Sequence, residues 1–490
     1  MHKQVARIVS VFILGMIIII SVSRVSDFLQ MKESDNRYAS FFAEKNQIEV
    51  IFLGSSHVRH GFFPMELWND YGITSYNLAG NGNTIPISYW TLVNALDYQT
   101  PKVVVMDIFD MWPGRKIGTS WGMVHTSLDA FPMSIHKYQM VRDLIDDKNM
   151  TAEEGDFVYD KRWELLFDLG EYHTRWGSIE EGDFDNQSKL EANSAIWRGA
   201  SPLIEISARN EYIYTENNNL CYDETAKDYL ERMIQLCADK NVDLLLINTG
   251  YDCNDEAKYF ADSVNEIAGQ YEIPYIDFTD LDIINFESDL HSSGHNTHIN
   301  FSGAEKFTSF IGQILSGGGQ YRLSDYRNDV KYNSWWSDHQ AFVNSKADYL
   351  REQSSLDLYL MFLADDDYNI IIEILDKSIL SETNNRCMIE NLGINVKKLN
   401  GNSNLVAVDM SNREVSYISN NYESDSSWIS VLGELCLKED LDGQQGGDTG
   451  AYGMYLNGQR IYTTRPDESV KIRITVINRG SGEMVDVHTF

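Results

Sequence analysis

A serine and a histidine that lie far apart in the sequence are the side chains best suited to covalent chemistry. The apolar run Val50–Leu53 leads straight into Gly54-Ser55-Ser56-His57, and His298 lies near the start of a later amphipathic stretch. Serine at its free pKa is a poor nucleophile, and an imidazole that takes its proton makes it reactive. The pair therefore predicts nucleophilic acyl transfer. Taken alone, residues 54–57 are more typical of an ordinary strand-to-helix turn with a capping serine, because short serine motifs are common.

The elements around these two residues are predicted to hold them in place. Residues 48–53 are apolar and β-branched, as in a buried strand, and Gly54 permits a sharp turn at its carboxyl end. That turn would bring Ser56 to the edge of the sheet, where open α/β folds bind ligands. After His298, Ser302 is the predicted N-cap of a helix, with Glu305 as its capping-box partner. Apolar residues then recur at helical spacing: Phe307, Phe310, Ile311 and Leu315.

Strands and helices alternate on both sides of residue 112, which predicts an α/β fold with a parallel, doubly wound sheet. The predicted strands are 73–77, 102–108, 242–248 and 273–278, and the predicted helices are 65–71, 86–96, 224–238 and 256–271. This alternation of strands and helices stops between about residues 112 and 220, a segment that is too long for an ordinary connection. We interpret it as an insertion that caps the site. Its many aromatic residues would form the core of this cap or stack on sugar rings.

The serine and histidine blocks together resemble the SGNH (GDSL-like) hydrolase family over residues 46–320. Gly54-Ser55-Ser56 stands where that family has Gly-Asp-Ser, and Asn77-Leu78-Ala79-Gly80-Asn81-Gly82 looks like its second block. The resemblance implies a flavodoxin-like three-layer sheet at 46–323, with Ser56 as nucleophile and His298 as base. It also implies an oxyanion-hole donor at the Gly82 amide. The family's Gly-x-Asn-Asp block is absent, and the side chain of Asn81 or Asn83 is a substitute donor.

The acid of a catalytic triad is not assigned by the sequence. The family's acid stands three residues before the histidine, where this chain has His295, which cannot act as a carboxylate. Asp289 and Glu287 lie upstream in the same predicted loop, and Asp289 is the nearer one. The alternative is a Ser56–His298 dyad in which a backbone carbonyl orients the imidazole.

Within the superfamily, three sequence blocks, at residues 54–57, 77–82 and 300–308, look like those of membrane-anchored bacterial proteins from polysaccharide gene clusters. These relatives are similar to the D-alanyl transfer protein of teichoic acid operons and to alginate O-acetylation proteins. The resemblance implies O-acyl transfer or ester hydrolysis on a cell-surface glycan, without a cofactor, and an acyl-donor membrane protein as a partner. The alternative is a non-catalytic protein whose degraded SGNH core binds a glycan or an assembly partner.

Residues 8–23 carry no charge and follow Lys3 and Arg7, a pattern typical of a membrane anchor with its N-terminus in the cytoplasm. We therefore expect residues 1–25 to anchor the protein in a bacterial cell membrane, with the rest outside. A cleaved signal peptide is the alternative, with Ser21-Val22-Ser23 as a loose cleavage site.

Composition excludes other classes of function. The 490 residues carry a formal charge of −33 and no basic cluster, which argues against a nucleic-acid partner. The five cysteines are scattered without a Cys-x-x-Cys pair, so no zinc site is indicated, although one disulfide among Cys221, Cys237 and Cys253 is conceivable. The histidines at 291, 295 and 298 fall in a predicted loop, and we expect no metal there.

Beyond residue 324 a helix near 338–352 leads to strand-like runs separated by Gly- and Asn-rich turns, including the predicted loop 443–450. We expect a smaller β-rich domain at 355–490. Residues 368–376, 392–393 and 472–485 faintly resemble the interleukin-like EMT-inducer domain, which would imply an accessory module that binds a glycan or a partner.

Overall fold

The structure is a computed structural model, and it describes most of the chain. The described residues are 2–31, 37–111, 116–151, 155, 157–167, 172–207, 223–250, 255–293, 296–364, 366–399, 404–419, 426–439, 452–464 and 469–490. His295, Cys221, Cys253 and the predicted loop 443–450 lie outside them.

A five-stranded parallel sheet forms the centre of the α/β part, as the sequence predicts. Its order is β2-β1-β3-β4-β5, the flavodoxin-like order, whose ligand crevice lies between the first and third strands of the chain. Three central strands are almost wholly buried, which explains their continuous apolar sequences. The strands are β1 (Val50–Leu53), β2 (Ser75–Asn77), β3 (Val103–Asp107), β4 (Asp243–Asn248) and β5 (Tyr275–Asp277).

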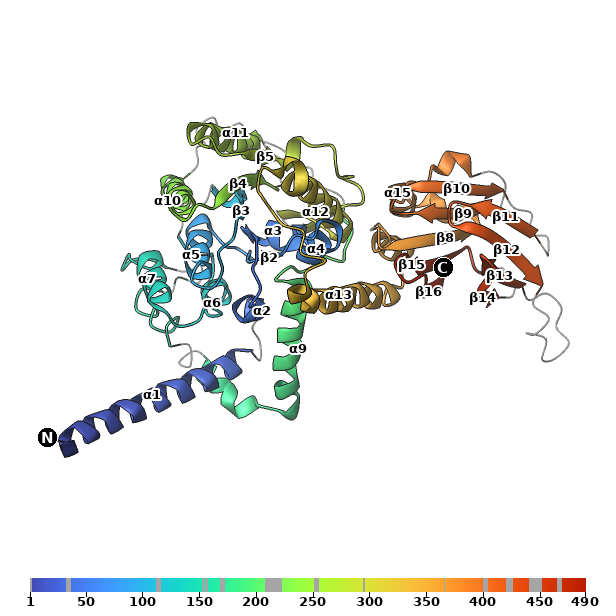
Figure 1. Cartoon of the computed structure of the whole chain (residues 1–490). Coiled ribbons are helices and arrows are strands. Elements are labelled where there is room, and N and C mark those ends of the chain that lie inside the picture. Colours follow the sequence, from blue (N-terminus) through green and yellow to red (C-terminus); the bar gives the residue numbers. More distant parts are fainter. Residues whose placement is uncertain are drawn as a thin grey trace.

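Helices cover both faces of this sheet (Figure 1). On one face α5 packs on α10, and on the other α12 packs on α3 and α4. Helices α3 and α4 follow β1, and α12 follows the segment that contains His298. Because these three helices pack together, the serine turn and the histidine segment meet on the same side of the sheet. The helices of this part are α2 (Ala39–Ala43), α3 (Ser56–Gly61), α4 (Pro64–Tyr71), α5 (Ile85–Ala95), α10 (Glu224–Lys240), α11 (Asp255–Gln270), η3 (Phe278–Asp280), α12 (Phe301–Ser316) and η4 (Gly317–Gly319).

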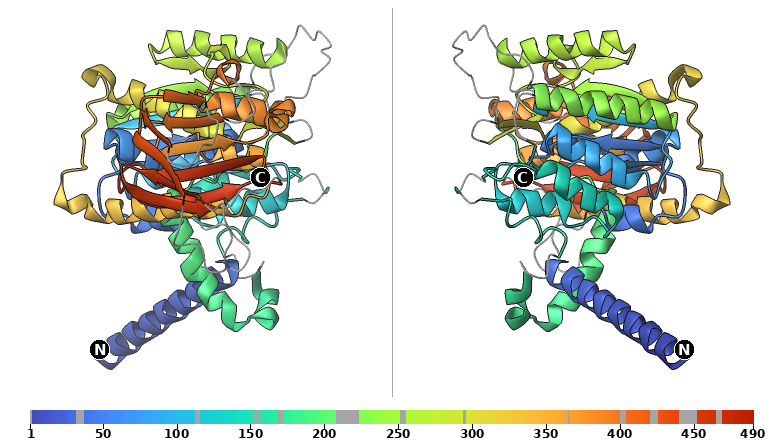
Figure 2. Two further views of the ribbon diagram at one scale, coloured as in Figure 1. Left: turned by 90° about the vertical axis from the view of Figure 1, so that its right-hand side faces the viewer. Right: turned by 90° about the vertical axis from the view of Figure 1, so that its left-hand side faces the viewer.

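The segment between β3 and β4 is mainly helical where it is described. Its elements are η1 (Phe109–Met111), α6 (Trp121–Leu128), α7 (Ile135–Leu144), η2 (His173–Ser178) and α9 (Glu181–Trp197). Its aromatic residues do not all form a core: Tyr172 is buried, but the side chains of Trp176 and Phe184 are 64% and 62% exposed. Only part of this segment lies near the serine turn, because η2 and the start of α9 extend away from the body beside α1 (Figures 1 and 2).

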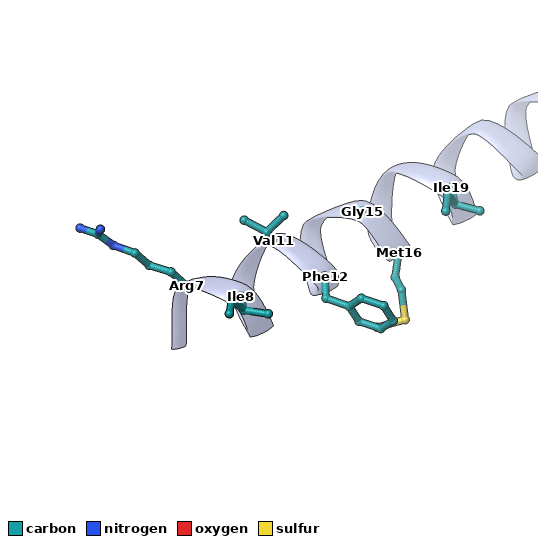
Figure 3. A pocket seen from close by; sticks show the side chains of 7 residues that line it. All are labelled: Arg7, Ile8, Val11, Phe12, Gly15, Met16 and Ile19. Atoms are coloured by element: carbon teal, nitrogen blue, oxygen red, sulfur yellow. The ribbon is translucent and has the colours of Figure 1, made fainter. Parts of the chain in front are cut away.

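The N-terminal helix α1 (His2–Met31) contains one stretch, Gln4–Ser26, that is long and apolar enough to cross a membrane. The side chains labelled in Figure 3, from Arg7 to Ile19, project outward and are not buried by the protein, whereas Ser26 at the end of the stretch is buried. The helix continues past the apolar stretch, where the Phe28 ring lies 4.8 Å from the Phe184 ring. Arg175 also donates a hydrogen bond to the Leu29 carbonyl. These features fit a single-pass anchor that is continuous with the folded part.

The C-terminal part is rich in antiparallel strands. One sheet has the order β10-β9-β8-β15-β16 and the other β11-β12-β13-β14. The strands are β8 (Tyr368–Ile374), β9 (Asn404–Asp409), β10 (Glu414–Ser419), β11 (Ser426–Ser430), β12 (Gly433–Glu439), β13 (Tyr452–Leu456), β14 (Gln459–Thr464), β15 (Ile472–Asn478) and β16 (Met484–Thr489). The helices that lead to it or lie within it are η5 (Val330–Tyr332), α13 (Asn333–Arg351), α14 (Leu356–Met361), η6 (Lys377–Ser381), α15 (Thr383–Asn391) and η7 (Val396–Lys398).

Helix α15 joins this part to the α/β part. Asn391 donates hydrogen bonds to Ser288 Oγ (2.7 Å) and to Asp289 Oδ1 (3.2 Å). The Cys387 thiol lies 3.1 Å from a carboxylate oxygen of Glu287. The C-terminal part therefore contacts the segment that leads to His298.

Candidate active site

The turn after β1 can be made only by glycine. Gly54 has φ +149°, and a Cβ there would lie 2.7 Å from Val58 and 2.9 Å from Asp107. The chain then turns into α3, whose first residue is Ser56. The loop of the second block is tied to this turn, because the Gly80 amide donates to the Gly54 carbonyl at 3.1 Å. The sharp turn therefore fixes the serine at the carboxyl edge of the sheet.

The predicted serine and histidine meet. Ser56 Oγ lies 2.7 Å from His298 Nε2, within hydrogen-bond distance. Both side chains are only partly buried. This distance and partial access are what a general base needs to take the serine proton while a substrate approaches.

His298 lies on a β-hairpin, not in the loop that the sequence predicts. Strands β6 (Leu290–Ser293) and β7 (Asn296–Ile299) pair antiparallel, with His291 opposite His298. The helix that follows also begins differently. Asn300 is its N-cap and accepts from the Gly303 amide, whereas Ser302 is buried in the first turn and donates to Asp289. An asparagine is as good an N-cap as a serine, and it lies closer to the end of the strand.

The ring of His57 packs on the imidazole of His298, and Phe109 packs on His57 in turn. The centroids of the His57 and His298 rings are 4.4 Å apart, and those of the Phe109 and His57 rings are 4.0 Å apart. Burial lowers the pKa of His57 well below its ordinary value, and the neighbouring His298 lowers it further. Burial also lowers the pKa of His60 to about 3. The imidazoles around Ser56 are therefore neutral at pH 7.

Asp289, the candidate acid of the triad, forms its hydrogen bonds with residues other than His298. Its carboxylate is fully buried and accepts from Lys306 Nζ (2.5 Å), Ser302 Oγ (2.9 Å) and the Asn285 amide (2.8 Å). Within the described residues, no hydrogen bond or ion pair joins Asp289 to His298. These contacts give Asp289 the geometry of an anchor for the loop before the hairpin.

The two predicted oxyanion donors, Gly82 and Asn83, both lie on the loop that contacts the serine turn. Gly82 has φ +66°, and a Cβ there would lie 3.1 Å from Met123 Sδ of α6. Asn83 is buried: its Oδ1 accepts from Ser127 Oγ (2.6 Å), and its Nδ2 has no hydrogen-bond partner in the described structure. The Nδ2 group is therefore an available donor.

A buried aspartate that sequence reasoning missed lies behind the site. Asp107 ends β3 and accepts from the amide and hydroxyl of Thr249, and the Thr249 backbone in turn hydrogen-bonds His57. Burial, together with a smaller effect of the nearby Asp110, raises the pKa of Asp107 to about 7. Its position at the carboxyl end of a predicted strand was the available signal.

The pH dependence of the base follows from its burial. Burial, together with a smaller effect of the neighbouring His291, lowers the pKa of His298 to about 4. A general base works in its neutral form, and its pKa sets the acid limb of kcat/KM. Ester hydrolysis should therefore hold its rate from neutral pH down to about 5.5, where an ordinary histidine would be mostly protonated. Initial rates across that range, with activity rechecked at pH 7, measure this; a midpoint near the ordinary histidine pKa would contradict it.

Comparisons with known proteins do not place the chain in a family. No family model matches it, and no curated protein matches it. Among solved structures, a protein from Bacteroides fragilis provisionally described as an acylhydrolase aligns over 57% of this chain and 94% of its own, at 10% identity and a TM-score of 0.27. A likeness at that TM-score carries no argument for fold or activity. The resemblance to SGNH hydrolases therefore rests on the residues quoted above.

Proposed function

We propose that the chain is a serine-dependent enzyme of the SGNH type that transfers or removes a small acyl group on a cell-surface polysaccharide or related glycan. One observation carries the chemistry: Ser56 Oγ and His298 Nε2 are 2.7 Å apart at the carboxyl edge of a parallel sheet. The glycan substrate and an acyl-donor membrane protein as partner follow from the resemblance of the three sequence blocks.

In the proposed reaction, His298 Nε2 takes the Ser56 proton as Oγ attacks the ester carbonyl. The tetrahedral oxyanion is stabilised by the Gly82 amide and the Asn83 side chain, because hydrogen-bond donors matter most where charge develops. The imidazolium then protonates the leaving alcohol, which leaves an acyl-serine. A sugar hydroxyl or water, deprotonated by His298, attacks the acyl-serine and regenerates Ser56.

We propose that this reaction uses a Ser-His dyad. The His57 ring, which stacks on His298 and is itself packed against Phe109, would restrict the plane of the His298 imidazole, which is the orienting task that a triad carboxylate performs elsewhere. The contacts of Asp289 support a role in holding the hairpin.

The protein should remain in the membrane fraction after alkaline carbonate washing, because we propose that α1 stays attached with its N-terminus in the cytoplasm. Immunoblotting of the washed membranes and sequencing of the N-terminus measure this. An N-terminus at or near Arg24 would show cleavage and contradict the anchor.

Labelling with a fluorophosphonate tests the enzyme assignment, since such probes modify only activated serines. The full-length protein in detergent should incorporate the label at Ser56, as mapped by peptide mass spectrometry. A chain that stays unlabelled and hydrolyses no ester would instead favour the non-catalytic glycan- or partner-binding alternative.

A further inference from the structure

Arg37 is a buried arginine that forms no ion pair with any of the described residues, and it lies near helix α3, which begins at Ser56. Arg37 is 2% exposed, and its Nη2 donates to the Tyr38 hydroxyl (3.0 Å). Its Nε and Nη1 groups have no hydrogen-bond partner in the described structure. Burying a guanidinium without a carboxylate or other acceptor is costly, because the charge loses its water shell.

The other buried arginines of this acidic chain are neutralised. Arg198, also 2% exposed, pairs with Glu44 (2.9 Å) and Asp338 (2.5 Å), and Arg473 pairs with Glu373 (2.7 Å). The chain has 73 acidic and 40 basic residues, so carboxylates are plentiful. Among the described residues, Arg37 is therefore the buried arginine without a carboxylate partner, which leaves its guanidinium able to pair with an external anion.

Arg37 lines a cavity of about 150 Å³. A second cation, Arg59 of α3, lines the same cavity, together with Asn193, Ser194 and the segment 199–202. Two guanidinium groups around a space of this size suit one small oxyanion, since their fixed N–H groups match carboxylate and phosphate oxygens.

Residues of the cavity wall are linked to elements of the proposed active site in two places. Arg59 follows Ser56 by three residues on α3, which places their Cβ atoms about 5–6 Å apart. Ser201, in the cavity wall, donates its amide to the Arg59 carbonyl (3.1 Å) and accepts from His60 Nδ1 (2.6 Å). On the other side, a Cβ at Gly80 would lie 2.3 Å from Arg37 Nη2, so the second-block loop needs glycine there to admit the guanidinium.

We infer that this cavity is an oxyanion subsite, which binds a phosphate or carboxylate group carried by the substrate whose ester Ser56 attacks. The inference rests on the proposed function for the ester and deepens it: the substrate is anionic. Arg37 supplies the buried, otherwise unpaired guanidinium, and Arg59 supplies the second charge.

Binding of inorganic phosphate tests the subsite without requiring catalysis. Isothermal titration of the full-length Ser56→Ala protein in detergent should give saturable 1:1 binding. Adding Arg37→Met should lower the affinity at least about 10-fold, while Arg386→Met, an exposed arginine of α15, should leave it unchanged. No binding to the parent protein, or equal binding after Arg37→Met, would overturn the inference. If Arg37→Met does not fold, Arg37→Lys keeps the charge without the bidentate fork and should still weaken binding.

A pair of esters tests the link to substrate. Acetylglycerol phosphate should have a higher kcat/KM than uncharged acetylglycerol in the native protein, and the ratio should fall toward one in the Arg37 variant. A carboxylate-bearing acetyl ester in parallel distinguishes the two kinds of oxyanion. A ratio unchanged by the Arg37 substitution overturns the substrate link. If neither ester is hydrolysed, the proposed function fails, and the phosphate titration still decides whether the subsite exists.

Discussion

Replacing Ser56 with alanine is expected to lower kcat for p-nitrophenyl acetate by at least about 10³-fold, because the hydroxyl is the attacking atom and nothing at that position replaces it. His298→Ala should cost about as much, since serine without a base reverts to a poor nucleophile. The double variant should be scarcely worse than either single one, because two residues that act as a unit are not additive. Steady-state kinetics of the full-length protein measure all three.

Ser55→Ala is the matched control for this result. Ser55 is in the same turn and buried, but its Oγ has no hydrogen-bond partner in the described structure. Its loss removes a hydroxyl of the same type without touching His298, so kcat should remain close to that of the native protein. Hydrolysis that survives Ser56→Ala unchanged would remove Ser56 from the mechanism.

Asp289→Asn is expected to lower stability more than catalysis. The substitution breaks the buried ion pair with Lys306, a loss of up to roughly 3–5 kcal/mol in the free energy of unfolding. Well below the melting temperature, kcat should fall less than about 10-fold, since the carboxylate does not contact His298 in the described structure. Thermal unfolding and kinetics on the same preparation separate the two effects.

Lys306→Met provides the companion variant, since it removes the other half of the pair. It should lower the melting temperature as Asp289→Asn does, because it leaves the Asp289 carboxylate buried without its cation. If Asp289→Asn instead lowers kcat by about 10² or more and leaves the melting temperature unchanged, Asp289 is the catalytic acid and a triad replaces the dyad.

Much of the α/β core could be predicted because its strands are buried on both faces. The predicted strand 102–108 contains β3, and 242–248 contains β4, since a continuous apolar run between helical patterns has few other interpretations. The meeting of Ser56 with His298 was predictable for a related reason. Parallel strands bring their carboxyl ends to one edge, and few side-chain pairs there could activate a nucleophile.

The partners of Asp289 could not be predicted, because they depend on tertiary contacts. A carboxylate nine residues before a histidine in sequence looks like a triad acid, but its strongest contact comes from Lys306 on the next helix. Another comes from Asn391 in the C-terminal part, 102 residues away. The hairpin of β6 and β7 was also missed, because its short polar strands carry no apolar alternation. Arg37 carries no sequence signal at all, since only the fold shows that it is buried and that no described carboxylate pairs with it.

The sheet of the C-terminal part has a consequence for biosynthesis. Strand β8 lies at its centre, between β9 and β15, and the buried pair Glu373–Arg473 that joins β8 to β15 spans 100 residues. As the proposed exported part of the chain emerges from the membrane, β9 is available soon after β8, whereas the other edge of β8 must wait for residues 472–478. Until then its Ile-rich edge offers unpaired amides and carbonyls to any neighbouring chain. The yield of correctly folded protein should therefore depend on the rate of export and on the density of emerging chains more than on the stability of the finished fold.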